Sequence, residues 1–420
     1  MALLRLDSRL LGNDGKTTCK CPENMVRLQA QCRFPYNTMK KLAVFSVLLL
    51  LTVGTPEPST DDMFTDEPTH QTEFVFNLYR SIVQEKPENN VTVSPYSVQR
   101  MLDLARSGAA SETKTEIEQI LGYTESVKWG TSPDGTLTIA DALWIQQGYP
   151  ILPEFLQTTR ENFGSSIEQA DFARNPNEAV KQINAWCSKN TKNKIPSLFD
   201  RLNPNTRLVL ANAIHFSADW KTRFNKNRTQ DGDFTLLDGR KTKTKLMSQE
   251  SVTKYGETDD TFALELPYKD EGYAMVLLLP KNPANFVQWE SKMTFQKFNL
   301  LRHLMAMNLV DLWMPKFTME SDIPLNETLQ QLGMQAAFDQ NKADFSKIAN
   351  VVEPLFVSDV LQKTFVEVDE TGTRAAAATG IALGCSAPSR PEIFHADRPF
   401  LYAIVKGNTV LFLGRFVKPI

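Results

Sequence analysis

Serine, histidine and aspartate side chains are the first candidates for chemistry, because together they can form a hydrolytic triad. The chain of 420 residues holds only four histidines, His70, His215, His303 and His395. No serine lies in a Gly-x-Ser-x-Gly elbow, and the sequence has no His-Glu-x-x-His motif, phosphate-binding glycine loop or dinucleotide fingerprint. His215 lies in an apolar run and is expected to be a satisfied core histidine. The sequence therefore predicts that the protein is not an enzyme.

Metal and cofactor sites are not predicted either. His303 and His395 are far from any cluster of cysteine or histidine, and Cys19 and Cys21 lack the spacing of a zinc finger. The net charge is −3 and the pI is about 6.0, which does not indicate nucleic acid or an anionic membrane as a partner. The one dense basic run, residues 240–245, follows an Asp-Gly turn and is typical of a solvated hairpin.

The most informative stretch is Phe365–Pro391, because its two halves favour different structures. Residues 365–369 alternate β-branched or aromatic residues with acids, which predicts a strand. Residues 372–379 then carry mostly glycine, alanine and threonine. Such a run can be a flexible linker, an alanine-rich helical turn, or a strand held in reserve, since small residues pass between neighbouring strands without a clash.

The N-terminal part of the chain indicates export. Residues 39–54 have the basic start, short apolar stretch and small-residue end of a secretory signal, and the apolar run is too short to span a bilayer. We interpret residues 1–38 as a doubtful N-terminal extension, residues 55–69 as a polar linker and residues 70–420 as one domain. A secreted, extracellular and monomeric protein is therefore expected.

Export would expose the chain to two kinds of covalent modification, N-glycosylation and disulfide formation. Three Asn-x-Thr sequons, at Asn90, Asn227 and Asn326, would be glycosylated in a eukaryotic secretory route. Of the cysteines, only Cys187 and Cys385 follow the presumed signal, so the domain is no disulfide scaffold.

Apolar periodicity predicts a mixture of helices and strands without an internal repeat. Helices are expected at 73–82, 98–108, 111–122, 178–189 and 325–332. Strands are expected at 137–145, 208–216, 262–266, 274–279, 310–314, 400–405 and 410–416. Because no linker divides these elements, one large α+β domain is the simplest interpretation.

Seven motifs in a fixed order give the chain a family resemblance over essentially all of residues 70–420. They are SPYSVQRMLDLARSGAASETKTEI (94–117), NAIHFSADWKTRF (212–224), ELPYKDEGYAMVLLLP (265–280), MPKF (314–317), LGMQAAF with ADFSKI (332–348), VEVDETGTRAAAAT (366–379) and DRPFLYAIVKGNTVLFLGRF (397–416). On these motifs the chain resembles a serpin of the inhibitory type.

The resemblance implies a serpin fold with three β-sheets, eight or nine helices and an exposed reactive loop, here 371–396. In inhibitory serpins the target protease cleaves this loop and becomes acylated, and the loop then inserts into the central sheet as a new strand. Small hinge residues allow fast insertion, because alternate side chains must enter a packed layer. The corresponding hinge residues are Gly372, Thr373, Arg374, Ala375, Ala376, Ala377, Ala378 and Thr379. Alternation directs Arg374 outward.

Other site residues are carried over from the family by position. Lys316 and Glu370 match the ion pair at the breach, where insertion begins, with Trp220 packing nearby. The polar cluster beneath the central sheet, called the shutter, is matched by Ser94, Ser97, Asn212 and Gln362. This cluster normally includes a histidine, and Gln362 replaces it, so the pH behaviour of sheet opening should differ.

A second departure lies between Leu121 and Leu137, where the family usually has its fourth helix. Only about fifteen residues remain, rich in glycine and proline. The fourth helix is expected to be shortened or absent, and activation by heparin through that helix is not expected.

Family spacing places the cleaved bond at Ser386–Ala387, with Cys385–Ser386 as the alternative. A small residue at this position favours an elastase-like or subtilisin-like serine protease as the target. Arg390 would suit a trypsin-like protease, but Pro391 follows it and obstructs cleavage. The alternative function is that of a non-inhibitory serpin acting as a carrier, chaperone or storage protein.

Overall fold

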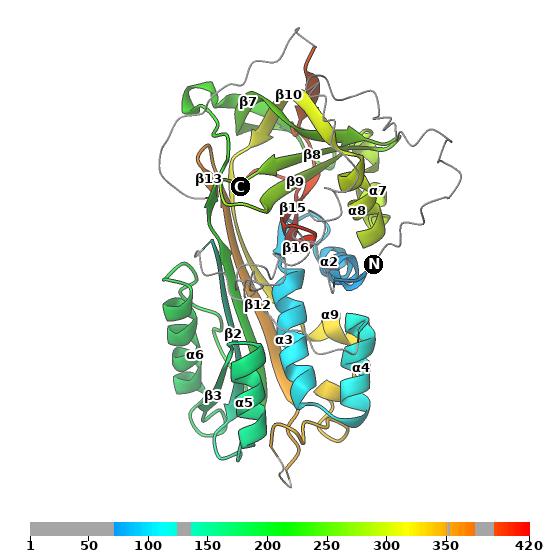
Figure 1. The fold of residues 1–420 in the computed structure, drawn as a ribbon. Helices are drawn as coiled ribbons and strands as arrows, with labels where there is room; N and C mark the ends of the chain where they lie inside the picture. Colours follow the sequence, from blue (N-terminus) through cyan, green and yellow to red (C-terminus); the bar gives the residue numbers. More distant parts are fainter. Residues whose placement is uncertain (1–70, 124–135, 350, 352, 374–389) are drawn as a thin grey trace, which may run out of the picture. The chain divides into compact units, whose positions relative to one another are not determined.

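The computed structural model describes residues 71–123, 136–349, 351, 353–373 and 390–420 (Figure 1). Helices form where apolar residues recur at helical spacing, and their ends follow local signals. In α3, the Ser94 side chain accepts a hydrogen bond from the Ser97 backbone and Pro95 occupies the first turn. The eight α-helices of the described residues are α2 (Phe74–Glu85), α3 (Pro95–Gly108), α4 (Ser111–Leu121), α5 (Pro153–Asn162), α6 (Pro176–Asn190), α7 (Phe286–Ser291), α8 (Phe295–Leu304) and α9 (Asn326–Gln331).

The described strands form three sheets with nine, five and two strands. The nine-stranded sheet contains β1 (Val91–Val93), β6 (Gln230–Thr235), β7 (Lys241–Glu257), β8 (Thr261–Pro267), β9 (Tyr273–Pro280), β10 (Ala306–Pro315), β14 (Glu392–His395), β15 (Phe400–Lys406) and β16 (Thr409–Phe416). The five-stranded sheet, in spatial order, contains β11 (Phe317–Pro324), β12 (Val357–Val368), β4 (Leu208–Phe216), β2 (Leu137–Gln146) and β3 (Ser166–Ala170). The smallest sheet pairs β13 (Gly372–Thr373) with β5 (Ala218–Asp219).

The five-stranded sheet is covered on both faces. Figure 1 shows α6 on one side of this sheet and α3 on the other. Apolar residues of α6 pack with Trp144 of β2 and Val209 of β4 in one buried cluster. Residues of α3 share a second cluster with Leu143 and Leu210, which point to the opposite face of the same strands. Every residue of β4 is buried, because this central strand has packed layers on both faces.

One junction in this sheet is important for the function that the sequence indicates. Strands β12 and β4 are parallel and directly paired, with Gln362 opposite Asn212. Each also pairs on its other side, β12 with β11 and β4 with β2. An additional strand could enter this junction only if β12 and β4 separated.

Several expected elements are confirmed. The strand predicted at 208–216 coincides with β4, and the helix predicted at 111–122 matches α4, which ends at Gly122 with a φ of 77°. The basic run 240–245 forms the solvated hairpin, because β6 and β7 pair antiparallel and Lys243 and Lys245 bind Asp233 and Asp231. His215 is buried and packs against Phe365.

Other expectations are corrected. The strand predicted at 365–369 begins at Val357, because the preceding polar residues also pair with β11 and β4. The loop predicted at 371–396 is too long at both ends, since residues 372–373 form β13 and residues 392–395 form β14, which pairs with β10. The expectation that the fourth helix is shortened or absent stays a prediction, because that stretch falls largely in 124–135, outside the described residues.

Candidate functional site

The breach residues meet in the structure. The Lys316 Nζ lies 3.0 Å from Glu370 Oε2 and 3.3 Å from Oε1. Thr229 donates a hydrogen bond of 2.8 Å to Glu370 Oε1, and the Phe224 backbone N–H donates to the Glu370 carbonyl at 2.9 Å. Burial alone would raise the pKa of Glu370, but the Thr229 hydroxyl and the Lys316 ammonium hold it below its usual value. Glu370 is therefore an ionised, buried anchor at the end of β12.

Trp220 fixes the turn that follows Glu370. Its indole N–H donates to the Asp369 carbonyl at 2.9 Å, and its backbone N–H donates to the Thr371 carbonyl at 3.0 Å. The Trp220 ring stacks on Tyr268 with centroids 4.5 Å apart and an interplanar angle of 10°. The three breach residues are thus brought together around one short turn.

The first two hinge residues are already paired with β5, the short strand that follows β4 in the sequence. Gly372 lies opposite Asp219 and Thr373 opposite Ala218, in antiparallel register. Gly372 has a φ of 154°, and a Cβ at this position would lie 2.3 Å from the Ala218 carbonyl oxygen. Only glycine fits this approach of two backbones.

Thr373 is fully buried, and its hydroxyl lies 3.0 Å from the Tyr268 hydroxyl. Burial raises the pKa of Tyr268, so its hydroxyl stays protonated and can donate or accept this hydrogen bond. The hinge therefore begins as a short strand held by a buried side-chain contact.

The shutter residues form one buried hydrogen-bonded cluster centred on Gln362. Its Oε1 accepts from the Ser94 backbone N–H at 2.8 Å. Its Nε2 lies 3.0 Å from the Ser94 carbonyl, 2.9 Å from the Ser97 hydroxyl and 2.8 Å from Asn212 Oδ1. Ser97 also donates to Asn212 Oδ1 at 2.8 Å. A glutamine can make these contacts at any pH, because its amide does not titrate.

The structure extends this cluster with two charged residues that the sequence did not single out. Asn212 donates through Nδ2 to Asp141, which forms an ion pair with Arg100 at 2.5 Å. Burial raises the pKa of Asp141, while Arg100 and Asn212 act in the opposite direction. The only signal in the sequence was that Asp141 is the sole acid within the predicted strand 137–145.

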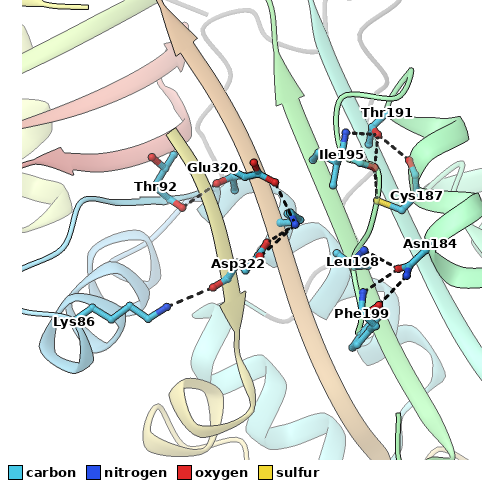
Figure 2. Close-up of polar contacts among 12 residues, drawn as sticks. Lys86, Thr92, Asn184, Cys187, Thr191, Ile195, Leu198, Phe199, Glu320 and Asp322 are labelled. Carbon is cyan, nitrogen blue, oxygen red and sulfur yellow. Dashed lines mark hydrogen bonds and ion pairs between the residues drawn. The ribbon is translucent and has the colours of Figure 1, made fainter. Parts of the chain in front are cut away.

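The segment that connects α6 to β4 is held against α6 by hydrogen bonds from side chains of the helix (Figure 2). Asn184 Oδ1 accepts from the backbone N–H groups of Leu198 and Phe199 at 2.7 and 2.9 Å, and its Nδ2 donates to the Phe199 carbonyl at 2.8 Å. The Cys187 thiol donates to the Ile195 carbonyl at 3.4 Å. Burial raises the pKa of Cys187 to about 12, so this cysteine is a packing residue rather than a reactive one.

Some predicted site residues cannot be placed. Arg374, the residues 375–379, Cys385, Ser386 and Ala387 lie outside the described residues. Among the described residues, no group of three or more histidine, cysteine or acidic side chains could hold a metal ion. No helix in the described part of the chain is both long and apolar enough to cross a bilayer.

Comparison with known proteins gives a consistent result. A family model described as serpin (serine protease inhibitor) matches residues 69–419. An uncharacterized serpin-like protein of Thermococcus kodakarensis is 35% identical over 365 residues, which cover 82% of this chain and 84% of that protein. Human leukocyte elastase inhibitor is 32% identical over 373 residues, covering 83% and 98%. The crystal structure of native protease nexin-1 with heparin superposes with a TM-score of 0.74 at 28% identity, covering 83% of this chain and 98% of the other.

Proposed function

Because the chain belongs to the serpin family, we propose that it is an irreversible suicide-substrate inhibitor of serine endopeptidases. The reactive loop is cleaved as a substrate, the protease remains attached as an acyl-enzyme, and the loop inserts between β12 and β4. Such an inhibitor is consumed by one reaction and needs no catalytic residue of its own.

The arrangement of β13 is the single observation that best supports this proposal. A strand inserted between two parallel neighbours and following β12 through a tight turn must run antiparallel to both. Residues 372–373 already run antiparallel to β5, which continues the line of β4. The next residues in the sequence are an arginine and four alanines, and alanine can enter a packed layer with little displacement.

The chemistry follows from the proposed bond. The protease serine attacks the carbonyl carbon of Ser386, an ester forms, and the amine of Ala387 leaves after taking the proton from the protease histidine. Insertion has to occur before water hydrolyses this ester. Cys385–Ser386 remains the alternative bond, and the same chemistry would apply one residue earlier.

The target class rests on the small side chain of Ser386. A shallow pocket, as in elastase-like or subtilisin-like proteases, accepts such a residue. The name of the human relative, leukocyte elastase inhibitor, supports the same class. We further propose that the protein acts outside the cell, after removal of the signal at residues 39–54.

The decisive experiment incubates the full chain with elastase-like, subtilisin-like and trypsin-like proteases and separates the products by SDS gel electrophoresis. A covalent complex of inhibitor and protease is expected, and sequencing the released C-terminal fragment should give Ala387 as its first residue. A fragment beginning at Ser386 would move the bond to the alternative position. If every protease only nicks the loop and stays active, inhibition is wrong and a carrier, chaperone or storage role replaces it.

A further inference from the structure

The three sequons place their acceptor asparagines in different surroundings. Asn90 precedes β1, and both polar atoms of its side chain contact the C-terminal segment. Its Nδ2 donates to the Lys418 carbonyl at 2.7 Å, and its Oδ1 accepts from the backbone N–H groups of Val417 and Lys418 at 2.7 and 3.2 Å. Asn90 therefore joins two segments more than three hundred residues apart in the sequence.

Asn326, the first residue of α9, plays a similar part. Its Nδ2 donates to the Ser358 carbonyl at 2.8 Å, and its Oδ1 accepts from the Val360 backbone N–H at 2.8 Å. Both partners belong to the first residues of β12, so the Asn326 side chain makes the hydrogen bonds there that the backbone of a neighbouring strand would otherwise make. As at Asn90, one N–H of the amide nitrogen that a glycan would need already donates to a backbone carbonyl.

Asn227 differs from both. It lies in the short 3-10 helix η2 (Lys226–Arg228), where all three residues are exposed. Its backbone N–H donates to Asn225 Oδ1 at 3.0 Å, but its side chain makes no hydrogen bond within the described part of the chain. Its amide nitrogen is therefore free to carry a substituent that projects into solvent.

N-linked glycosylation acts on the atom that distinguishes these sites. The asparagine Nδ2 forms a bond to the anomeric carbon of a lipid-linked oligosaccharyl diphosphate, the diphosphate leaves, and one amide proton is lost. At Asn90 and Asn326 the sugar would compete with a backbone carbonyl for the space beside Nδ2. The modified amide keeps one N–H, so at Asn90 and Asn326 the sugar has to project away from the backbone carbonyl that this N–H contacts, whereas no such contact restricts a sugar at Asn227 within the described part of the chain.

We propose that Asn227 is the N-glycosylation site of this protein, and that Asn90 and Asn326 are structural clamps that remain unmodified in the folded chain. The proposal rests on the proposed export of the protein and does not depend on inhibition of a protease. It assigns opposite roles to three sequons of the same Asn-x-Thr type.

The first test measures site occupancy. The full chain is secreted from eukaryotic cells behind an added cleavable signal, and each sequon is scored by mass spectrometry after enzymatic removal of the glycans. Asn227 should be occupied, and Asn227→Gln should abolish the glycan-dependent mass shift, whereas Asn90→Gln and Asn326→Gln should leave it unchanged. An unoccupied Asn227 in the secreted protein, or occupancy at Asn90 or Asn326 comparable to that at Asn227, would overturn the assignment.

The second test needs no secretion and uses unglycosylated protein made in bacteria. Asn90→Gln and Asn326→Gln should each lower the thermal midpoint by roughly 2–6 °C, because two or three backbone hydrogen bonds are lost. Asn227→Gln is the matched control and should leave the midpoint unchanged. Equal shifts for all three variants would show that the clamps do not exist. Neither test uses a protease, so a failure of the glycosylation proposal can be told apart from a failure of the proposed inhibition.

Discussion

Replacing Gln362 by leucine tests whether the shutter cluster keeps the sheet closed. The two side chains have similar volumes, so the change removes the amide while the buried space stays filled. Of the groups that Gln362 contacts, the Ser94 carbonyl also accepts from the Val98 N–H, and Asn212 Oδ1 also accepts from Ser97. The Ser94 backbone N–H has only the Gln362 oxygen, at 2.8 Å, among the hydrogen bonds described.

The expected loss follows from these contacts. A buried N–H left without a partner costs about 1–3 kcal/mol, and the other lost amide contacts add about 1 kcal/mol. We therefore expect Gln362→Leu to lower the free energy of unfolding of the intact protein by roughly 2–4 kcal/mol. Because Gln362 and Asn212 are direct partners across the β12–β4 junction, an inserted strand would separate them. In the loop-cleaved form, Gln362→Leu should therefore lower the free energy of unfolding by less than in the intact form.

The assay is urea unfolding of intact and loop-cleaved protein, followed by tryptophan fluorescence. Gln84→Leu, at an exposed position of α2, is the matched control and should leave both curves unchanged. Equal destabilisation of the intact and cleaved forms by Gln362→Leu would refute the reasoning, because the contact would then not be specific to the closed sheet. An unchanged intact protein would refute it as well.

Three further substitutions and one binding test address the remaining features. Thr373→Arg would force a charge into the buried site beside Tyr268. The fraction of the protein that ends as a covalent complex with the protease should fall, and the fraction that is only cleaved should rise. An unchanged ratio of the two products would contradict a role for the buried Thr373 in loop insertion. The hydrogen bond from Thr229 and the ion pair with Lys316 lower the pKa of Glu370, so its ionised carboxylate stabilises the folded protein above the usual pKa of 4.5, and this stabilisation is lost as the pH falls through the lower pKa of the folded state. The difference in free energy of unfolding between wild type and Glu370→Gln should therefore be largest at neutral pH and shrink in acid. Burial lowers the pKa of His215 to about 4 from 6.5, so the unfolded chain binds the extra proton and stability should rise from pH 4 to 6.5; His215→Phe should flatten that rise in denaturant titrations. The protein should pass through a heparin column at low salt, and strong, salt-dependent retention with faster inhibition would show that the expectation is wrong.

Much of the central architecture could be predicted from local patterns. The run 208–216 is apolar apart from Asn212 and His215, a pattern typical of a strand with packed layers on both faces, and β4 has that position. Helix α5 could not be found in this way, because only Phe155 and Thr159 of its ten residues are buried and no apolar period remains. Strand β11 alternates, but its acids and short length obscured the pattern.

The site was predictable only where the family resemblance supplied it. Lys316 and Glu370 lie 54 residues apart, and no local pattern indicates their ion pair. The contact of Tyr268 with Thr373 spans 105 residues and joins two positions that look unremarkable in sequence. Long-range pairing of this kind depends on the whole topology, so residues such as Tyr268 and Asp141 emerged only from the structure.

Thermal unfolding before and after a single cleavage in the reactive loop tests the central claim most directly. If residues 374–379 complete the strand that residues 372–373 begin, the cleaved protein gains hydrogen bonds on both sides of that strand and should unfold at a markedly higher temperature than the intact protein. A cleaved protein that unfolds at the same or a lower temperature would contradict loop insertion, and with it the proposed mechanism of inhibition.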